Sequence, residues 1–160
     1  MNEEIPKPAR AIEQSKFPES ISDGDITVIE AFQRSNLRTG DLDADAEGGR
    51  FLSTRTEADV LHRINDEGGI VALKDSEELM GYFLASSYAL ATTVDSQRVF
   101  LEQAKVFRPD IAHDLILHQC FVAPDYRGSK VPATLLREIK RRFGARYAYG
   151  VGKIGADNNA

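Results

Sequence analysis

The residues whose types and spacing most clearly suggest a chemical role lie in the segment 118–133, where a predicted strand is followed by a turn and then by a helix. Residues 115–122 are rich in strand formers, Pro124-Asp125 supplies turn chemistry, and a helical apolar stripe starts at Val131. The N–H groups of such a loop and of the first helical turn point at one spot, where the helix dipole favours negative charge. The segment therefore predicts a binding site for a pyrophosphate group.

A sequence resemblance adds to this prediction. Val122-Ala123-Pro124-Asp125-Tyr126-Arg127-Gly128, with Val131 and Leu135-Leu136 after it, resembles the acyl-CoA-binding motif of GNAT N-acyltransferases. That motif is usually written Q/R-x-x-G-x-G/A; here it begins at Arg127, and its small positions fall on Lys130 and Pro132. Pro132 offers no N–H to a phosphate, and Lys130 is bulky where backbone normally approaches the cofactor. Lysine is, however, itself a phosphate-binding charge, and proline is preorganised for the start of a helix.

The resemblance implies an α/β (α+β) fold: a GNAT-like mixed, mostly antiparallel sheet flanked by helices, whose central parallel strand pair opens into a V-shaped cleft. It implies acetyl-CoA as the acyl donor and no metal. The residues expected to contact the donor are Cys120, Phe121, Val122, Arg127, Gly128, Ser129, Lys130, Val131, Pro132, Ala133 and Asn158. In the family, a helix with a frequent tyrosine acid and two closing strands follow, so this chain resembles a C-terminally shortened member.

The activity implied is transfer of an acetyl group to the amine of a small molecule or peptide by direct attack, with a strand N–H polarising the thioester carbonyl. No catalytic residue is assigned, because His118 and Glu30 are only nominal candidates for the base. Lys130, Pro132 and the shortened end motivate an alternative, a catalytically degenerate binding or regulatory module. A third possibility is a piece of a longer protein, in which an exposed strand edge favours a homodimer.

Composition limits the other classes of function. The chain has 160 residues, 42% of them hydrophobic, which suits one domain over 1–160 with a loose lead-in at 1–10. A net charge of -5 disfavours nucleic-acid binding and tolerates cationic amines. The most apolar stretch, 82–90, is too short and too rich in serine to span a membrane. The single cysteine, Cys120, is expected to be a structural, buried thiol, and it fits a cytoplasmic protein. The histidines lack the spacing of metal ligands.

Periodicity and turn residues predict the elements that must position this site. Helices are expected from Ser22 to about residue 40, from Thr56 to Gly68-Gly69, over 95–108 and over 131–143. A hairpin is expected from 70–73 and 81–88 with a slightly long turn, a central strand over 115–122, and a strand over 147–154 parallel to it. A weaker strand signal covers 11–16, and 41–50 is predicted to be a surface loop.

Overall fold

A four-stranded sheet is the centre of the computed structural model, which describes residues 12–47, 52 and 54–153. Its strands are β1 (Ile70–Asp75), β2 (Glu78–Ser86), β3 (Leu115–Val122) and β4 (Gly150–Gly152), in that spatial order. The pairs β1–β2 and β2–β3 are antiparallel, whereas β3 and β4 are parallel. The predicted mixed, mostly antiparallel sheet with one parallel pair is therefore confirmed, although β4 lies at the edge of the described sheet.

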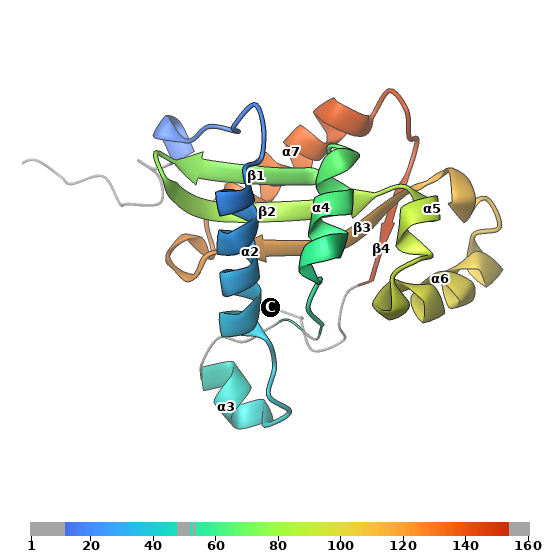
Figure 1. The fold of residues 1–160 in the computed structure, drawn as a ribbon, viewed down its shortest axis with the longest axis horizontal. Coiled ribbons are helices and arrows are strands. Elements are labelled where there is room, and N and C mark those ends of the chain that lie inside the picture. Colours follow the sequence, from blue (N-terminus) through green and yellow to red (C-terminus); the bar gives the residue numbers. More distant parts are fainter. Residues whose placement is uncertain (1–11, 48–51, 53, 154–160) are drawn as a thin grey trace, which may run out of the picture.

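Helices cover both faces of this sheet (Figure 1). α2 (Asp23–Asn36) and α4 (Ala58–Asp66) lie on one face, and α7 (Val131–Phe143) lies on the other. α5 (Tyr88–Ala91) and α6 (Asp95–Phe107) lie beside the end of the sheet near β4. The short α3 (Leu42–Glu47) lies beyond the end of α2, and two 3-10 turns, Ile111–His113 and Pro124–Tyr126, flank β3. None of the described helices is both long and apolar enough to cross a membrane.

The start of α2 follows the sequence prediction closely. The Ser22 hydroxyl accepts a hydrogen bond from the Asp25 N–H at 3.1 Å, and the Asp25 carboxylate accepts one from the Ser22 N–H at 3.0 Å. This reciprocal capping box satisfies two N–H groups that the first turn would leave without partners. Asp25 also meets the Lys74 ammonium at 2.9 Å, so the cap ties α2 to β1.

Glycines set how closely the elements of the core approach one another. A Cβ on Gly81 of β2 would lie 2.8 Å from the Phe121 carbonyl oxygen and 3.0 Å from the Val131 side chain. Only glycine therefore lets the first turn of α7 rest against β2 at this distance. Gly68, with φ +74°, ends α4 in the left-handed region as expected for a helix that stops at glycine.

Several predicted boundaries are wrong, each for a local physical reason. The hairpin turn is shorter than expected because Asp75 pairs with Glu78, and Ser76 adopts φ 52° to make the tight connection. Part of the predicted loop 41–50 is helix α3, whose buried Asp45 accepts hydrogen bonds from Thr39. Residues 12–14 are helical rather than extended, and only Lys16 bridges to β1.

The second helix, α4, also starts later than predicted, with Glu57 and not Thr56 at its N-cap. The Gln33 side chain binds both the N–H and the carbonyl of Thr56, at 2.6 and 3.2 Å. These bonds tie Thr56 to α2, so a local capping pattern is overridden by a contact that is distant in sequence.

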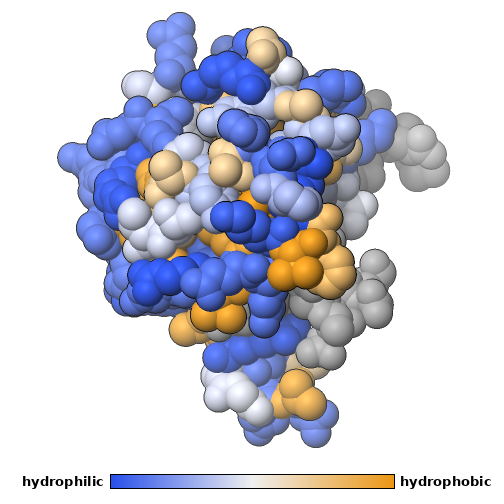
Figure 2. Space-filling model, turned by 90° about the vertical axis from the view of Figure 1, so that its right-hand side faces the viewer, coloured by the Kyte–Doolittle hydropathy of each residue, from blue (hydrophilic) through white to orange (hydrophobic). Residues whose placement is uncertain are grey.

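On α6, the half-buried Phe100 packs beside Leu101 against a small apolar cluster, whereas other apolar side chains of the helix face solvent. Val99, Val106 and Phe107 are exposed, whereas Leu101 and Gln97 are buried. Figure 2 looks onto the side where α5 and α6 lie, a mainly hydrophilic surface with hydrophobic residues between the polar ones. The helix predicted over 95–108 is confirmed as Asp95–Phe107.

Candidate functional site

The open edge of β3 is the first part of the candidate site. β4 pairs with β3 only from Leu115 to Leu117, so residues 118–122 have no partner strand on that side within the described chain. The register with β2 skips His118, because Leu84 pairs with Gln119 and Ala85 pairs with Leu117. Such a bulge bends the strand and increases its local twist. The described pairing of the two parallel strands ends at Leu117, next to this bulge.

The backbone N–H groups of β3 point alternately toward β2 and toward the open edge. The Ala123 N–H donates to the Met80 carbonyl of β2 at 2.9 Å. Since successive N–H groups of a strand point to opposite sides, Phe121 also donates toward β2, and the amides of Cys120 and Val122 point toward the open edge. These two N–H groups are available to a bound chain that lies alongside β3.

The N-terminus of α7 forms the second part of the site. Gly128 takes φ +74° and turns the chain into the helix, whose N-cap is Lys130. The Val131 N–H donates to the Ser129 hydroxyl at 3.3 Å. In the described part of the chain, the amides of Gly128, Lys130 and Ala133 make no hydrogen bond. Pro132 thus removes one amide from the first turn, but three others remain where the helix dipole favours an anion.

One cavity, with a volume of about 340 Å³, is lined by Cys120 of the open edge and by Pro132 of the first turn of α7; the other residues predicted to contact the donor that the structure describes do not line it. The residues that line it come from β2, β3, the first half of α7 and the end of β4: Phe83, Leu117, His118, Gln119, Cys120, Pro132, Leu136, Gly152 and Lys153. This lining is mainly apolar, with Lys153 as its one permanently charged side chain among the described residues. A ligand with an anionic end and a long, weakly polar arm fits such a combination.

His118 is held neutral beside this cavity. Its Nε2 lies 2.6 Å from the Ser86 hydroxyl, which itself donates to the Ser87 carbonyl at 2.9 Å. The Ser86 hydroxyl has a single proton and already donates it to Ser87, so Nε2 of His118 must be the donor in the other contact. Nε2 therefore carries the imidazole proton, and Nδ1 is unprotonated. Nδ1 is buried without a hydrogen-bond partner among the described residues, and burial lowers the pKa of His118 to about 4.

Cys120 differs from its prediction, because it is exposed rather than buried and it lines the cavity. Neighbouring protein atoms still desolvate the thiol enough to raise its pKa to about 11, so the thiol form dominates at neutral pH. Glu30, the other nominal base, lies on α2 with its carboxylate 4.0 Å from Arg34. The cavity lining contains no carboxylate among the described residues.

The remaining predicted contacts take different positions. The Arg127 guanidinium lies over the Phe121 ring, donates to the Val122 carbonyl at 3.3 Å and donates to Asn36 at 3.1 Å. Its side chain therefore braces the loop against α2, and only its backbone belongs to the loop. Phe121 is buried against Tyr82, with ring centroids 5.5 Å apart. Asn158 lies outside the described residues.

Sequence reasoning missed the contribution of β4. Gly150 and Gly152 share the face of β4 that meets α7, while Val151 packs on the opposite side with Ile116. An alternating Gly-Val-Gly within a predicted strand is the signal that could have indicated a hollow there, because glycine in a strand often marks close approach of a ligand. Among the described residues, no cluster of His, Cys, Asp or Glu is arranged to hold a metal ion.

Comparisons with known proteins find likeness only among solved structures. No protein-family model matches the chain, and no curated protein matches it. Among solved structures, it is similar to an aminoglycoside acetyltransferase from an uncultured soil metagenomic sample, with 12% identity and a TM-score of 0.47. The match covers 89% of this chain and 80% of that one. At this distance, any function of the present chain has to be argued from its own residues.

Proposed function

We propose that this protein is a GNAT-like N-acyltransferase that transfers an acyl group, in the first instance acetyl, from acyl-CoA to the amine of a small molecule or peptide. The observation that supports the proposal is the meeting of two features at one cavity: Cys120 from the open edge of β3 and Pro132 from the first turn of α7 both line it. The open edge suits an amide-bearing arm such as pantetheine, and the helix start suits a diphosphate.

The residues present are compatible with this donor despite the two departures from the family motif. Pro132 leaves the amides of Gly128, Lys130 and Ala133 for phosphate oxygens, and the Lys130 ammonium adds positive charge at the same end of α7. The outward amides of Cys120 and Val122 would hold the arm by strand-like hydrogen bonds. The donor supplies the thioester, and these amides would place and polarise its carbonyl.

The chemical step needs little more from the protein than position and polarity. The amine nitrogen attacks the carbonyl carbon, the C–N bond forms, the C–S bond breaks and the thiol leaves with a proton. A strand N–H directed at the carbonyl oxygen stabilises the negative charge that develops there. With a pKa near 4, His118 would be a weak base at neutral pH, so we assign it no proton transfer.

Isothermal titration with acetyl-CoA and with free CoA tests this function. We expect saturable binding, and a Lys130→Glu variant should bind about tenfold more weakly, since one charge-assisted contact is replaced by repulsion. A glutamate at a helix N-terminus is favoured by the dipole, so the variant should not lose stability. Lys105→Glu on the exposed side of α6 is the matched charge reversal. Absence of heat and of a thermal shift at millimolar CoA would eliminate the proposal.

A second candidate is a binding or regulatory module that holds acyl-CoA without turning it over. The lack of a carboxylate in the described cavity lining and the low pKa of His118 favour it, because neither supplies a proton acceptor suited to neutral pH. Thiol release in a panel of amines separates the two candidates. Amine-dependent release supports the transferase, whereas tight binding without release across the panel supports the module.

A further inference from the structure

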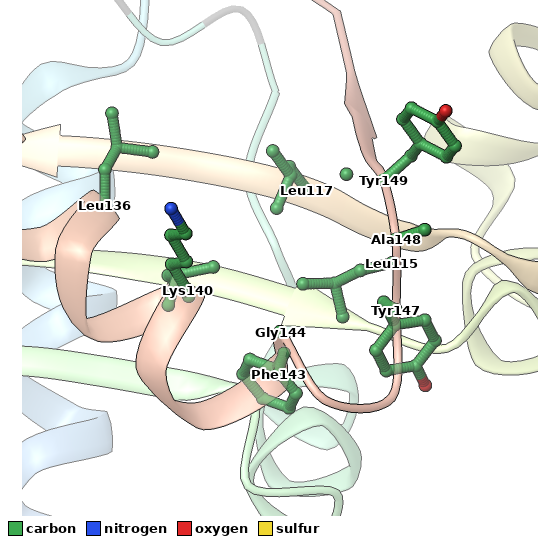
Figure 3. A pocket seen from close by; sticks show the side chains of 11 residues that line it. Leu115, Leu117, Leu136, Lys140, Phe143, Gly144, Tyr147, Ala148 and Tyr149 are labelled. Carbon is green, nitrogen blue, oxygen red and sulfur yellow. The ribbon is translucent and has the colours of Figure 1, made fainter.

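A second apolar cavity adjoins the proposed donor cavity on the α7 side of β4. It has a volume of about 270 Å³ and lies between β3, the second half of α7 and the segment that leads into β4. Leu117 and Leu136 line both cavities, so the two are neighbours. Figure 3 shows Leu115 and Leu117 of β3 in the space between α7 and the segment that carries Tyr147 and Tyr149.

The glycines of β4 explain why this space is hollow. Gly150 lines the second cavity and Gly152 lines the first, so β4 directs no side chain toward α7 in either. A Cβ at Gly150 would lie 3.3 Å from Leu117 Cδ1, and one at Gly152 would lie 3.2 Å from Leu117 Cβ. Larger residues at these two positions would crowd Leu117, which lines both cavities.

We infer that the second cavity receives the hydrocarbon chain of the acyl donor, so that the favoured substrates carry straight, uncharged acyl groups longer than acetyl. The inference rests on the proposed function, because it places the thioester in the first cavity beside the open edge of β3. Leu117 and Leu136 line both cavities, and Ile139 and Phe143 line the second one with them. Lys140, the charged side chain in this lining, is on the exposed side of α7 and can keep its ammonium in water.

Alkyl-CoA thioethers test the inference without knowledge of the amine. Each methylene transferred from water to an apolar site gains about 0.8 kcal/mol at most, which corresponds to about fourfold in affinity. Between S-ethyl-CoA and S-hexyl-CoA, we therefore expect the dissociation constant to fall by about 16- to 250-fold, for a gain of about two- to fourfold per methylene. Free CoA, which lacks the chain, reports on the donor site alone.

Two variants fill the second cavity from different sides. Gly150→Ala adds a methyl group next to the flexible end of Leu117, and Ala148→Leu fills the space from an exposed position. Both variants should reduce the gain in affinity per added methylene of the thioether, while their affinity for free CoA should stay within about threefold of the wild-type value. Ala145→Leu, the same substitution at an exposed residue outside the cavity, is the matched control and should keep the dependence.

The outcomes separate the two proposals. If free CoA binds but affinity does not rise from ethyl to hexyl, the acyl cavity is refuted and the donor site stands. If affinity rises equally in the wild type, Gly150→Ala and Ala148→Leu, the chain binds elsewhere, and the inference is also refuted. Failure of free CoA and of every thioether to bind removes the proposed function itself. Thermal unfolding of each variant verifies that the fold is retained.

Discussion

Acidification should destabilise this protein through His118, and the size of the effect can be worked out. In the unfolded chain the imidazole has a pKa of 6.5, whereas burial lowers it to about 4 in the folded protein. The unfolded state therefore binds more protons between these two values, so stability falls as the pH drops from 6.5 toward 4. Between pH 7.5 and pH 5.0, this linkage predicts a loss of about 2 kcal/mol in the free energy of unfolding.

The hydrogen bonds around His118 explain why acidification lowers the stability. Nε2 already donates to Ser86, so a second proton would have to sit on Nδ1, which is buried and has no acceptor among the described residues. The charged ring would lose its hydration without gaining a partner. A carboxylate that accepted a hydrogen bond from Nδ1 would offset this cost, but no carboxylate among the described residues does so.

Urea unfolding at the two pH values measures the effect in the wild type and in two variants. His118→Gln keeps a side chain able to donate to Ser86 but cannot titrate, so its loss on acidification should be about 2 kcal/mol smaller. His113→Gln makes the same substitution at an exposed histidine and is the matched control. An equal loss in His118→Gln and in the wild type would refute the claim that His118 is folded in its neutral form.

Carboxylates contribute to acid sensitivity in the same direction and must be separated from His118. Burial raises the pKa of Asp25, but hydrogen bonds from Ser22 and Lys74 lower it overall. The hydrogen bond from Arg141 lowers the pKa of Glu138. A lowered carboxylate pKa gives stability that is present above the unfolded value and is lost as the pH falls below it. Both groups are retained in the histidine variants, so their contribution cancels in the comparison.

Three further predictions concern packing, capping and the thiol. Gly81→Ala should destabilise the fold by about 1 to 3 kcal/mol in urea unfolding, because the added Cβ would meet the backbone of Phe121. The control Gly24→Ala should be neutral or stabilising, because its added Cβ would make only ordinary contacts. Ser22→Ala should cost about 1 kcal/mol through the lost N-cap, and a change within error would argue against the capping box. Cys120 should react with a disulfide reagent about tenfold more slowly at pH 7 than after unfolding in urea, because a pKa of about 11 lowers the thiolate fraction about 100-fold while the more basic thiolate is about tenfold more nucleophilic.

Local patterns predicted the elements well wherever the chemistry that defines them is itself local. Ser22 and Asp25 are three residues apart, so the cap at the start of α2 could be read from the chain. The helix α7 likewise follows from its apolar periodicity, and the parallel pairing of β4 with β3 follows from the usual right-handed crossover between parallel strands. Thr56 shows the limit, because its apparent cap was overridden by Gln33, a residue on another helix.

The candidate site could be predicted only where it consists of backbone. The turn from β3 into α7 was identified because a strand, a turn and a helix in series direct amides at one place. The side chains were harder to place: Arg127 belongs to the predicted motif, yet it braces the loop against Asn36. Cys120 is exposed where the described pairing of β3 with β4 has ended, and no local pattern around the cysteine encodes where that pairing ends.

Two small features of the strands together determine whether a cavity exists at all. The bulge at His118 lies where the described pairing of β3 with β4 ends, and space beside such a strand end is normally filled by side chains in a packed protein. Here the strand that faces α7 across the gap carries glycine at both inward positions, Gly150 and Gly152, so the space is left open. Glycine weakens a strand, and a β4 without inward side chains has little packing of its own to stabilise it. A ligand that fills the gap would supply the missing contacts, so binding of the acyl donor should stabilise the pairing of β4 with β3 in particular.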